Sequence, residues 1–231
     1  MEHEQQGANG TPPGPEDDFV VEFDFDGGWL GLTLHEGTKA EARQLAADLV
    51  AQFDPLCLDV SKAALQQELE EHALSVQESG PLLAAVAYTD SGVFLADMAV
   101  LAYGEDGVTR PSPKEYEGML LKWSYAEVKG DAQITEVELP IGPAVRVQAV
   151  LVEKRRFGWG KKLSESVRYW VWPTGHEEIL LAEARWLNFE RTDELTDLVD
   201  RIMPSLRLVP VPPEPTHPEP GPAAPESPRE L

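Results

Sequence analysis

Residues 19–26 read FVVEFDFD, and this stretch decides how the domain begins to fold. Its odd positions hold Phe or Val, and its even positions from 22 onward hold acids. Successive side chains of a strand point to opposite faces, so one face is apolar and the other faces water. That pattern is typical of an antiparallel sheet covered on one side. The following Asp26-Gly27-Gly28 predicts a hairpin turn into a second alternating strand over 30–34.

Four segments carry the signals of helices. Thr38 and Glu41 have the spacing of a capping box, which predicts a helix over 38–53 that ends before Pro55. Ser61 predicts the start of a second helix that reaches Gly80. Two more are predicted over 112–128, after a cap followed by proline, and over 192–204, with acids in the first turn.

Further strands are predicted wherever apolar residues alternate or run together between turn residues, over 82–88, 93–103, 134–139, 145–152, 167–172 and 179–189. The total is about eight strands and about four helices, with consecutive strands close enough to form hairpins. We therefore predict an α+β fold with a central antiparallel sheet flanked by helices. Strands and helices do not alternate, which argues against a doubly wound nucleotide-binding fold.

Composition divides the 231 residues into three parts. Residues 1–18 are polar and acidic without periodicity, so we expect a disordered acidic arm. Residues 19–208 contain no linker-like break and predict a single α+β domain. Residues 209–231 read VPVPPEPTHPEPGPAAPESPREL, a proline density that predicts a disordered tail without helix or strand.

The chain is strongly acidic, with a net charge of −22. Binding to nucleic acid or to an anionic membrane surface requires basic residues, so we expect neither. The charge suits solubility, or a basic protein partner attracted by the field. The N-terminus resembles no secretory signal and no window is apolar enough to span a membrane, which predicts a cytoplasmic protein. Few lysines and many Ala and Pro residues suggest a GC-rich bacterial genome.

The last part of the domain carries a family resemblance. Residues 179–208 read ILLAEARWLNFERTDELTDLVDRIMPSLRL, an apolar strand followed by a helix that ends near a Ser-Leu-Arg segment. With the hairpin before it, from about residue 145, this order resembles the PsbP-like superfamily and is similar to small proteins and lipoproteins of actinobacteria. The resemblance implies an α/β/α sandwich and a docking or accessory role rather than catalysis.

Residues 154–172 are the candidate protein-binding segment. Basic and aromatic residues crowd into it, and these types anchor many interfaces. The alternative is that Trp159 folds back onto the sheet while the basic residues protect an edge strand. The candidate set is Lys154, Arg155, Arg156, Phe157, Trp159, Lys161, Lys162, Arg168, Trp170 and Trp172.

No motif indicates catalysis, a metal or a cofactor, and we predict none of them. Cys57 lies between leucines and is expected to be a buried structural thiol. Asp24 and Asp26 begin like a calcium loop, but His35 stands where the closing Glu belongs. His176 has no companion ligands at a useful spacing, and the two glycines around Trp159 are too few for a phosphate loop.

Three functions remain open from the sequence. The first is a non-enzymatic accessory or adaptor domain that binds another protein through the 154–172 hairpin or the acidic surface. The second is an immunity-type or antagonist protein whose acids neutralise a basic toxin. The third is an enzyme or small-ligand carrier with a site between sheet and helices, which a pocket with converging polar side chains would favour.

Overall fold

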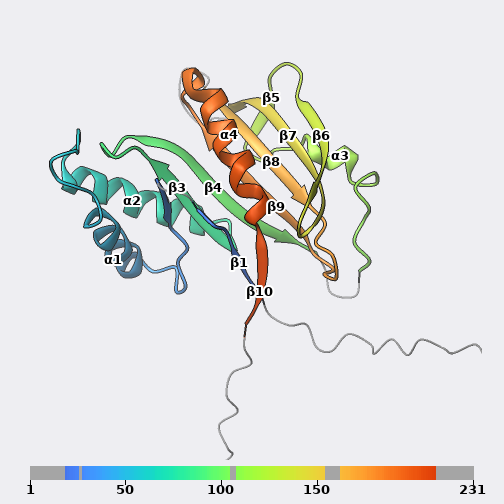
Figure 1. The fold of residues 1–231 in the computed structure, drawn as a ribbon, viewed down its shortest axis with the longest axis horizontal. Coiled ribbons are helices and arrows are strands. Elements are labelled where there is room, and N and C mark those ends of the chain that lie inside the picture. Colours follow the sequence, from blue (N-terminus) through green and yellow to red (C-terminus); the bar gives the residue numbers. More distant parts are fainter. Residues whose placement is uncertain (1–18, 26–27, 105–107, 154–161, 212–231) are drawn as a thin grey trace, which may run out of the picture.

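The computed structural model describes residues 19–25, 28–104, 108–153 and 162–211. These residues form an α+β fold with four α-helices, one eight-stranded antiparallel sheet and one two-stranded sheet (Figure 1). The predicted fold class is confirmed. The arm at 1–18 and the tail from 212 onward lie outside the described residues.

The large sheet follows the order β2-β3-β4-β9-β8-β7-β5, and β6 also pairs with β7. Its strands are β2 (Trp29–Gly31), β3 (Leu83–Tyr88), β4 (Phe94–Tyr103), β5 (Ala126–Val128), β6 (Gln133–Leu139), β7 (Gly142–Glu153), β8 (Leu163–Val171) and β9 (Ile179–Trp186). Every neighbouring pair is antiparallel. The predicted strands from residue 82 onward are thus confirmed, with small shifts at their ends.

Helix α4 (Thr192–Ile202) covers one face of this sheet (Figure 1). Leu195, Val199 and Ile202 form its buried stripe against the apolar side chains of β4, β8 and β9. Polar contacts fix the same helix, since Asp200 accepts hydrogen bonds from Arg146 and from the Tyr169 hydroxyl. The predicted helix is confirmed, although Thr192 lies inside it and a short 3₁₀ turn (Phe189–Arg191) precedes it.

The opposite face of the sheet is covered at its two ends by different segments. Helices α1 (Lys39–Val50) and α2 (Lys62–Gln77) pack on β3 at one end. The segment 112–125, which contains the single-turn helix α3 (Glu117–Leu120), packs on β7, β8 and β9 at the other. The central strands between these covers are therefore the place where polar side chains can lie partly enclosed.

Both long N-terminal helices begin where the sequence predicts. The Thr38 hydroxyl accepts the backbone N–H of Glu41, and the Ser61 hydroxyl accepts that of Ala64. The Glu41 carboxylate also accepts backbone N–H groups from three residues of the preceding loop, 35–37. Those three hydrogen bonds lower the pKa of Glu41, against an opposing effect of burial. The loop and the helix are thereby joined as one unit.

The prediction for residues 19–34 is wrong in its pairing. Strand β1 (Phe19–Glu22) pairs with β10 (Arg207–Pro210) in the small sheet, whereas β2 pairs with β3. Arg207 fixes the small sheet through ion pairs with Glu22 and Asp24. The predicted turn at 26–27 lies outside the described residues. The strand β10 also extends through Pro210, where the sequence predicts only tail.

The helix predicted over 112–128 is also wrong, except for the single helical turn at Glu117–Leu120. The Ser112 and Glu115 capping contacts form as predicted, but the helical turn ends at Leu120. Trp123 and Ala126 are buried on the sheet, and 126–128 pair with β7 as strand β5. These tertiary contacts outweigh the helical preference of the segment.

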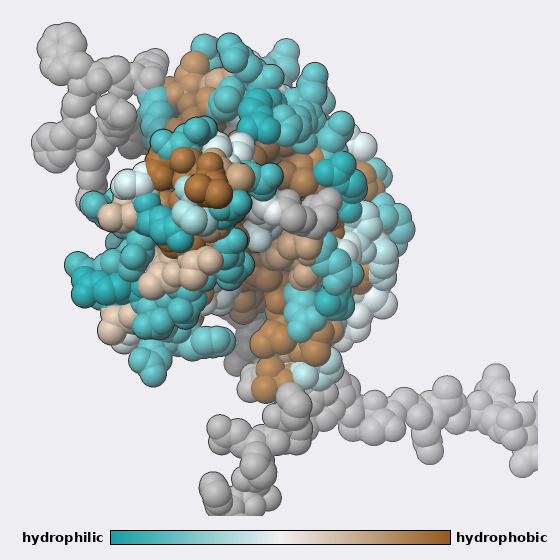
Figure 2. Space-filling model, turned by 60° about the vertical axis from the view of Figure 1, so that its left-hand side comes forward, coloured by the Kyte–Doolittle hydropathy of each residue, from teal (hydrophilic) through white to brown (hydrophobic). Residues whose placement is uncertain are grey.

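Most of the surface on the side of α1 and α2 is hydrophilic, as the net charge suggests. Figure 2 shows this face, with hydrophobic side chains gathered toward the base of the domain, near the small sheet. Among the described residues, no helix is both long and apolar enough to cross a membrane.

Candidate functional site

A polar cluster lies on the sheet face between the two covers. It comprises six residues of the sheet, namely Asp97, Glu153, Ser166, Arg168, Glu183 and Arg185. Trp123 and Tyr125 lie above them. The two central ion pairs are cross-strand pairs, because Asp97 lies opposite Arg185 and Arg168 lies opposite Glu183 in the strand register. Opposite charges at directly paired positions stabilise a sheet when they lie on one face.

Glu183 is the centre of this polar cluster. Its Oε1 accepts hydrogen bonds from Trp123 Nε1 at 2.9 Å, the Tyr125 hydroxyl at 2.6 Å and Ser166 Oγ at 2.8 Å. Its Oε2 accepts Arg168 Nη2 at 2.8 Å. Burial acts to raise the pKa of Glu183, but the Arg168 charge and these hydrogen bonds outweigh it, so the pKa is lowered. A carboxylate so fully bonded is unsuited to proton transfer and serves as an anchor.

Arg168 is enclosed on all sides. Its side chain is 5% exposed, and its guanidinium lies 3.9 Å from the centre of the Trp123 ring. Its Nη1 donates to the carbonyl of Lys122 at 2.8 Å, which ties the 112–125 segment to the sheet. The third donor, Nε, is buried without a partner among the described residues.

Arg185 and its carboxylates form the second half of the cluster. Arg185 lies 3.2 Å from Asp97 and 3.7 Å from Glu153. Burial raises the pKa of Asp97, against the lowering effect of the Arg185 charge. The pKa of Arg185 is raised, because Asp97 and Tyr125 outweigh the opposing effect of burial. Arg185 therefore remains charged and holds both carboxylates in place.

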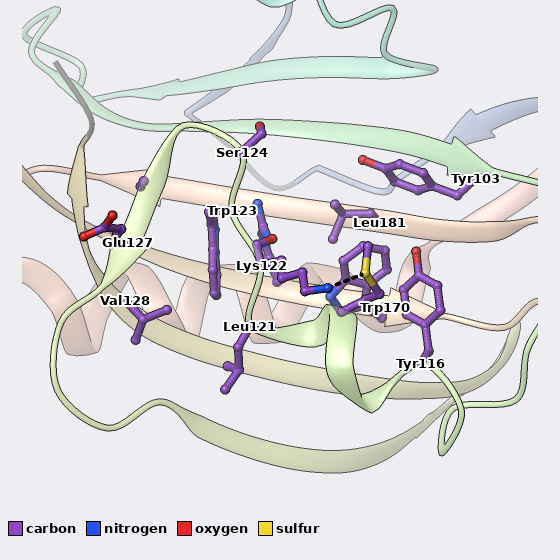
Figure 3. A pocket seen from close by; sticks show the side chains of 13 residues that line it. Tyr103, Tyr116, Leu121, Lys122, Trp123, Ser124, Glu127, Val128, Trp170 and Leu181 are labelled. Carbon is purple, nitrogen blue, oxygen red and sulfur yellow. Dashed lines mark hydrogen bonds between the residues drawn. The ribbon is translucent and has the colours of Figure 1, made fainter. Parts of the chain in front are cut away.

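A pocket of about 680 Å³ opens next to the polar cluster. Its walls come from the end of β4, the 112–125 segment, β5, β8 and β9, and four aromatic rings dominate them, those of Tyr103, Tyr116, Trp123 and Trp170. Figure 3 shows Tyr103, Tyr116 and Trp170 grouped at one end of the pocket and Trp123 toward the other. The volume lies in the range of roughly 300–1,000 Å³ that small-molecule sites occupy.

The ring contacts at this end of the pocket are close. The Trp170 ring centre lies 4.9 Å from that of Tyr116 and 5.6 Å from that of Tyr103. Trp170 is 4% exposed, and its Nε1 has no hydrogen-bond partner among the described residues. Burial raises the pKa of both tyrosines, so their hydroxyls keep their protons at neutral pH. The pocket therefore combines apolar surface with several hydrogen-bond donors.

The structure places the predicted protein-binding residues in three different settings. Arg168, Trp170 and Trp172 are buried on the inner face, which leaves them no surface for a protein partner. Lys162 is half-buried and pairs with Glu153 at 3.5 Å. The remaining six, Lys154, Arg155, Arg156, Phe157, Trp159 and Lys161, lie outside the described residues, and protein binding through them stays a prediction.

Cys57 is exposed rather than buried as predicted. Pro55 follows the end of α1, and in the turn there the neighbouring Leu56 is exposed as well. The Asp54 charge raises the pKa of the Cys57 thiol, so at neutral pH the group stays protonated and is a poor nucleophile. Within the described ranges, no group of three or more His, Cys, Asp and Glu is arranged to hold a metal ion.

Sequence reasoning named Arg168 and Trp170, but for protein binding, and missed the other residues that line this pocket. Arg168, Trp170 and Trp172 alternate along one strand, and Glu183 and Arg185 interrupt an apolar strand on one of its faces. When two such strands pair so that their charged residues share one face, those residues form a polar cluster. The sequence does not say that β8 and β9 pair in that register.

Comparison with known proteins adds no assignment. No protein-family model matches the chain, and no curated protein is similar to it. The resemblance to the PsbP-like superfamily therefore stays a prediction.

A pH titration tests the role of Glu183. Its lowered pKa means that the ionised group stabilises the fold above its ordinary value of 4.5, a contribution lost as the pH falls toward the lowered pKa. Replacing Glu183 with Gln should remove this part of the acid sensitivity below about pH 5, measured by urea unfolding at each pH. Asp97 acts in the opposite sense in the wild type and in the variant. Because its pKa is raised, its ionisation lowers the stability of the fold as the pH rises.

The matched control is Glu136→Gln on the exposed strand β6, which should leave the acid sensitivity unchanged. If Glu183→Gln and the wild type showed the same pH dependence, Glu183 would not be the ionised anchor of the cluster.

Proposed function

We propose that this protein is a non-enzymatic carrier or sensor of a small molecule, which binds in the pocket beside the polar cluster. The observation that carries the proposal is the pocket of about 680 Å³ itself, whose walls bring four aromatic rings together with the side chains of Lys122 and Arg168.

The cluster behind the pocket supports the same proposal. Its ion pairs and hydrogen bonds hold Trp123, Arg168 and the 112–125 segment in fixed positions, so the aromatic walls are formed before a ligand arrives. A preformed site loses less entropy on binding. Glu183, the carboxylate at the centre of the cluster, is fully bonded, which favours binding over catalysis.

A ligand screen tests the proposal. A library of soluble aromatic fragments, examined by ligand-observed NMR, should give binders that also quench the tryptophan fluorescence of the protein. The variant Met119→Trp places a bulky side chain in the wall of the pocket, at a position that is 41% exposed and can accept it without a core rearrangement. We expect this variant to lose most of the binders.

Leu187→Trp is the matched control, because Leu187 is 43% exposed and lies outside the pocket. It should bind the same fragments as the wild type. If no fragment binds the wild type, or if both variants bind equally well, the proposal is wrong.

A further inference from the structure

The pocket also carries information about its ligand. We infer that it binds a flat aromatic molecule with a carboxylate group, an inference that rests on the proposed function. Three features of the walls lead to it, namely the aromatic surface, the excess of donors and the position of Lys122.

The aromatic walls define the shape of the ligand. Tyr103, Tyr116 and Trp170 enclose one end, while Leu181 and Val128 add aliphatic surface. Rings prefer offset-stacked or edge-on contact with other rings, at centroid distances of roughly 4.5–7 Å. A planar bicyclic ring system can make such contacts. Its volume is well below the volume of about 680 Å³ that the pocket offers.

The polar groups of the walls are mostly donors. Lys122 Nζ can only donate, and the hydroxyls of Tyr103 and Tyr116 can donate as well as accept. Tyr103 and Tyr116 keep their hydroxyl protons because burial raises their pKa values. A ligand that satisfies these groups must bring acceptor oxygens, and a carboxylate brings the most acceptor capacity for its size.

Lys122 favours a negative charge. Its Nζ donates to the thioether of Met119 at 3.3 Å, a weak acceptor, and within the described ranges it forms no ion pair (Figure 3). Arg168 also lines the pocket but is already paired with Glu183, so Lys122 is the cation that a ligand can meet, with one lining acid, Glu127. Figure 3 shows the Glu127 side chain at the far end, away from the ammonium group.

The rival ligand is a cation held by the aromatic rings. The structure disfavours it, because the Trp123 face is already occupied by the Arg168 guanidinium at 3.9 Å. An incoming ammonium group would also be repelled by Lys122. The charge of the ligand is therefore the property that separates the two possibilities.

Three probes that share one ring system test the inference. We would measure the affinities of naphthalene-2-carboxylate, 2-naphthamide and 2-naphthylmethylamine for the full chain by isothermal titration. The carboxylate should bind about tenfold or more tightly than the amine, since it accepts charge-assisted hydrogen bonds, whereas the protonated amine only donates and is repelled by Lys122. The amide, a neutral acceptor, should fall between them.

Two variants connect the result to named groups. Lys122→Met should weaken the affinity for the carboxylate by up to about fivefold, because it removes only a partly exposed charge. The affinity for the amide should stay unchanged. Lys129→Met, at an exposed lysine outside the pocket, is its control. Tyr116→Phe keeps the ring but removes the hydroxyl donor, and should weaken the binding of both the carboxylate and the amide by about fivefold or more. Thermal unfolding and near-UV circular dichroism would confirm that each variant is folded.

The outcomes are distinguishable. If the amine binds as tightly as the carboxylate, or if Lys122→Met leaves the carboxylate affinity unchanged, the inference is wrong. If none of the three probes binds while fragments of another class do occupy the pocket, the ligand class is wrong and the proposed function stands. If nothing binds in the pocket at all, both fail together.

Discussion

Replacing Arg168 with Met should destabilise the protein by about 3–5 kcal/mol, because it leaves the Glu183 carboxylate buried without its counter-charge. The variant also loses the hydrogen bond to the carbonyl of Lys122 and the contact with the Trp123 ring. Chemical unfolding monitored by tryptophan fluorescence gives the free energy. A loss below about 1 kcal/mol would contradict the structural role of this ion pair.

Two further variants separate the charge effect from loss of packing. In Arg168→Met/Glu183→Gln the uncompensated charge is gone, so part of the lost stability should return. Arg191→Met breaks an ion pair of the same type with Glu194 on the surface, where the Arg191 side chain is 31% exposed. That change should cost no more than about 1 kcal/mol. The difference between the two arginines measures what burial adds.

Replacing Gly142 with Ala should cost at least about 2 kcal/mol, because backbone strain and overpacking each contribute about 1–3 kcal/mol. Gly142 begins strand β7 with a φ of 148°, and an added Cβ would meet the carbonyl oxygen of Trp172 at a distance below van der Waals contact. Since the obstacle is backbone, a side-chain rotation does not relieve it. Thermal and urea unfolding measure the loss.

Gly118→Ala is the matched control for this change. Gly118 lies in α3 with a negative φ, and nothing stands within 4 Å of the added Cβ. Its stability should change by less than about 0.5 kcal/mol, or rise slightly, because alanine lowers the entropy of the unfolded chain. Equal losses in both variants would contradict the tight approach of β7 to the β8–β9 turn.

Much of the fold follows from local sequence. Thr38 and Ser61 cap their helices as predicted, because a hydroxyl that accepts an N–H of the first turn acts within a few residues. The alternation along β7 and the apolar run of β9 likewise predicted strands that the structure confirms. These signals are reliable because each one depends on neighbours in the chain.

The errors occur where distant partners decide. The hairpin predicted after residue 26 fails because β1 takes β10 as its partner, at the other end of the chain. The helix predicted to Val128 fails because Trp123 and Tyr125 bond to Glu183, about sixty residues away. Local preference is worth only tenths of a kcal/mol to about 1 kcal/mol per residue, and burial of a tryptophan outweighs it.

The candidate site shows the same division between sequence and structure. The sequence by itself determined the α+β class, the helix starts, the acidic charge and the concentration of basic and aromatic residues near 154–172. Only the tertiary structure decided that Arg168 and Trp170 face inward with Glu183 and the 112–125 segment. The physical reason is register, since a strand's alternation assigns its residues to two faces, but the pairing of strands decides what each face meets.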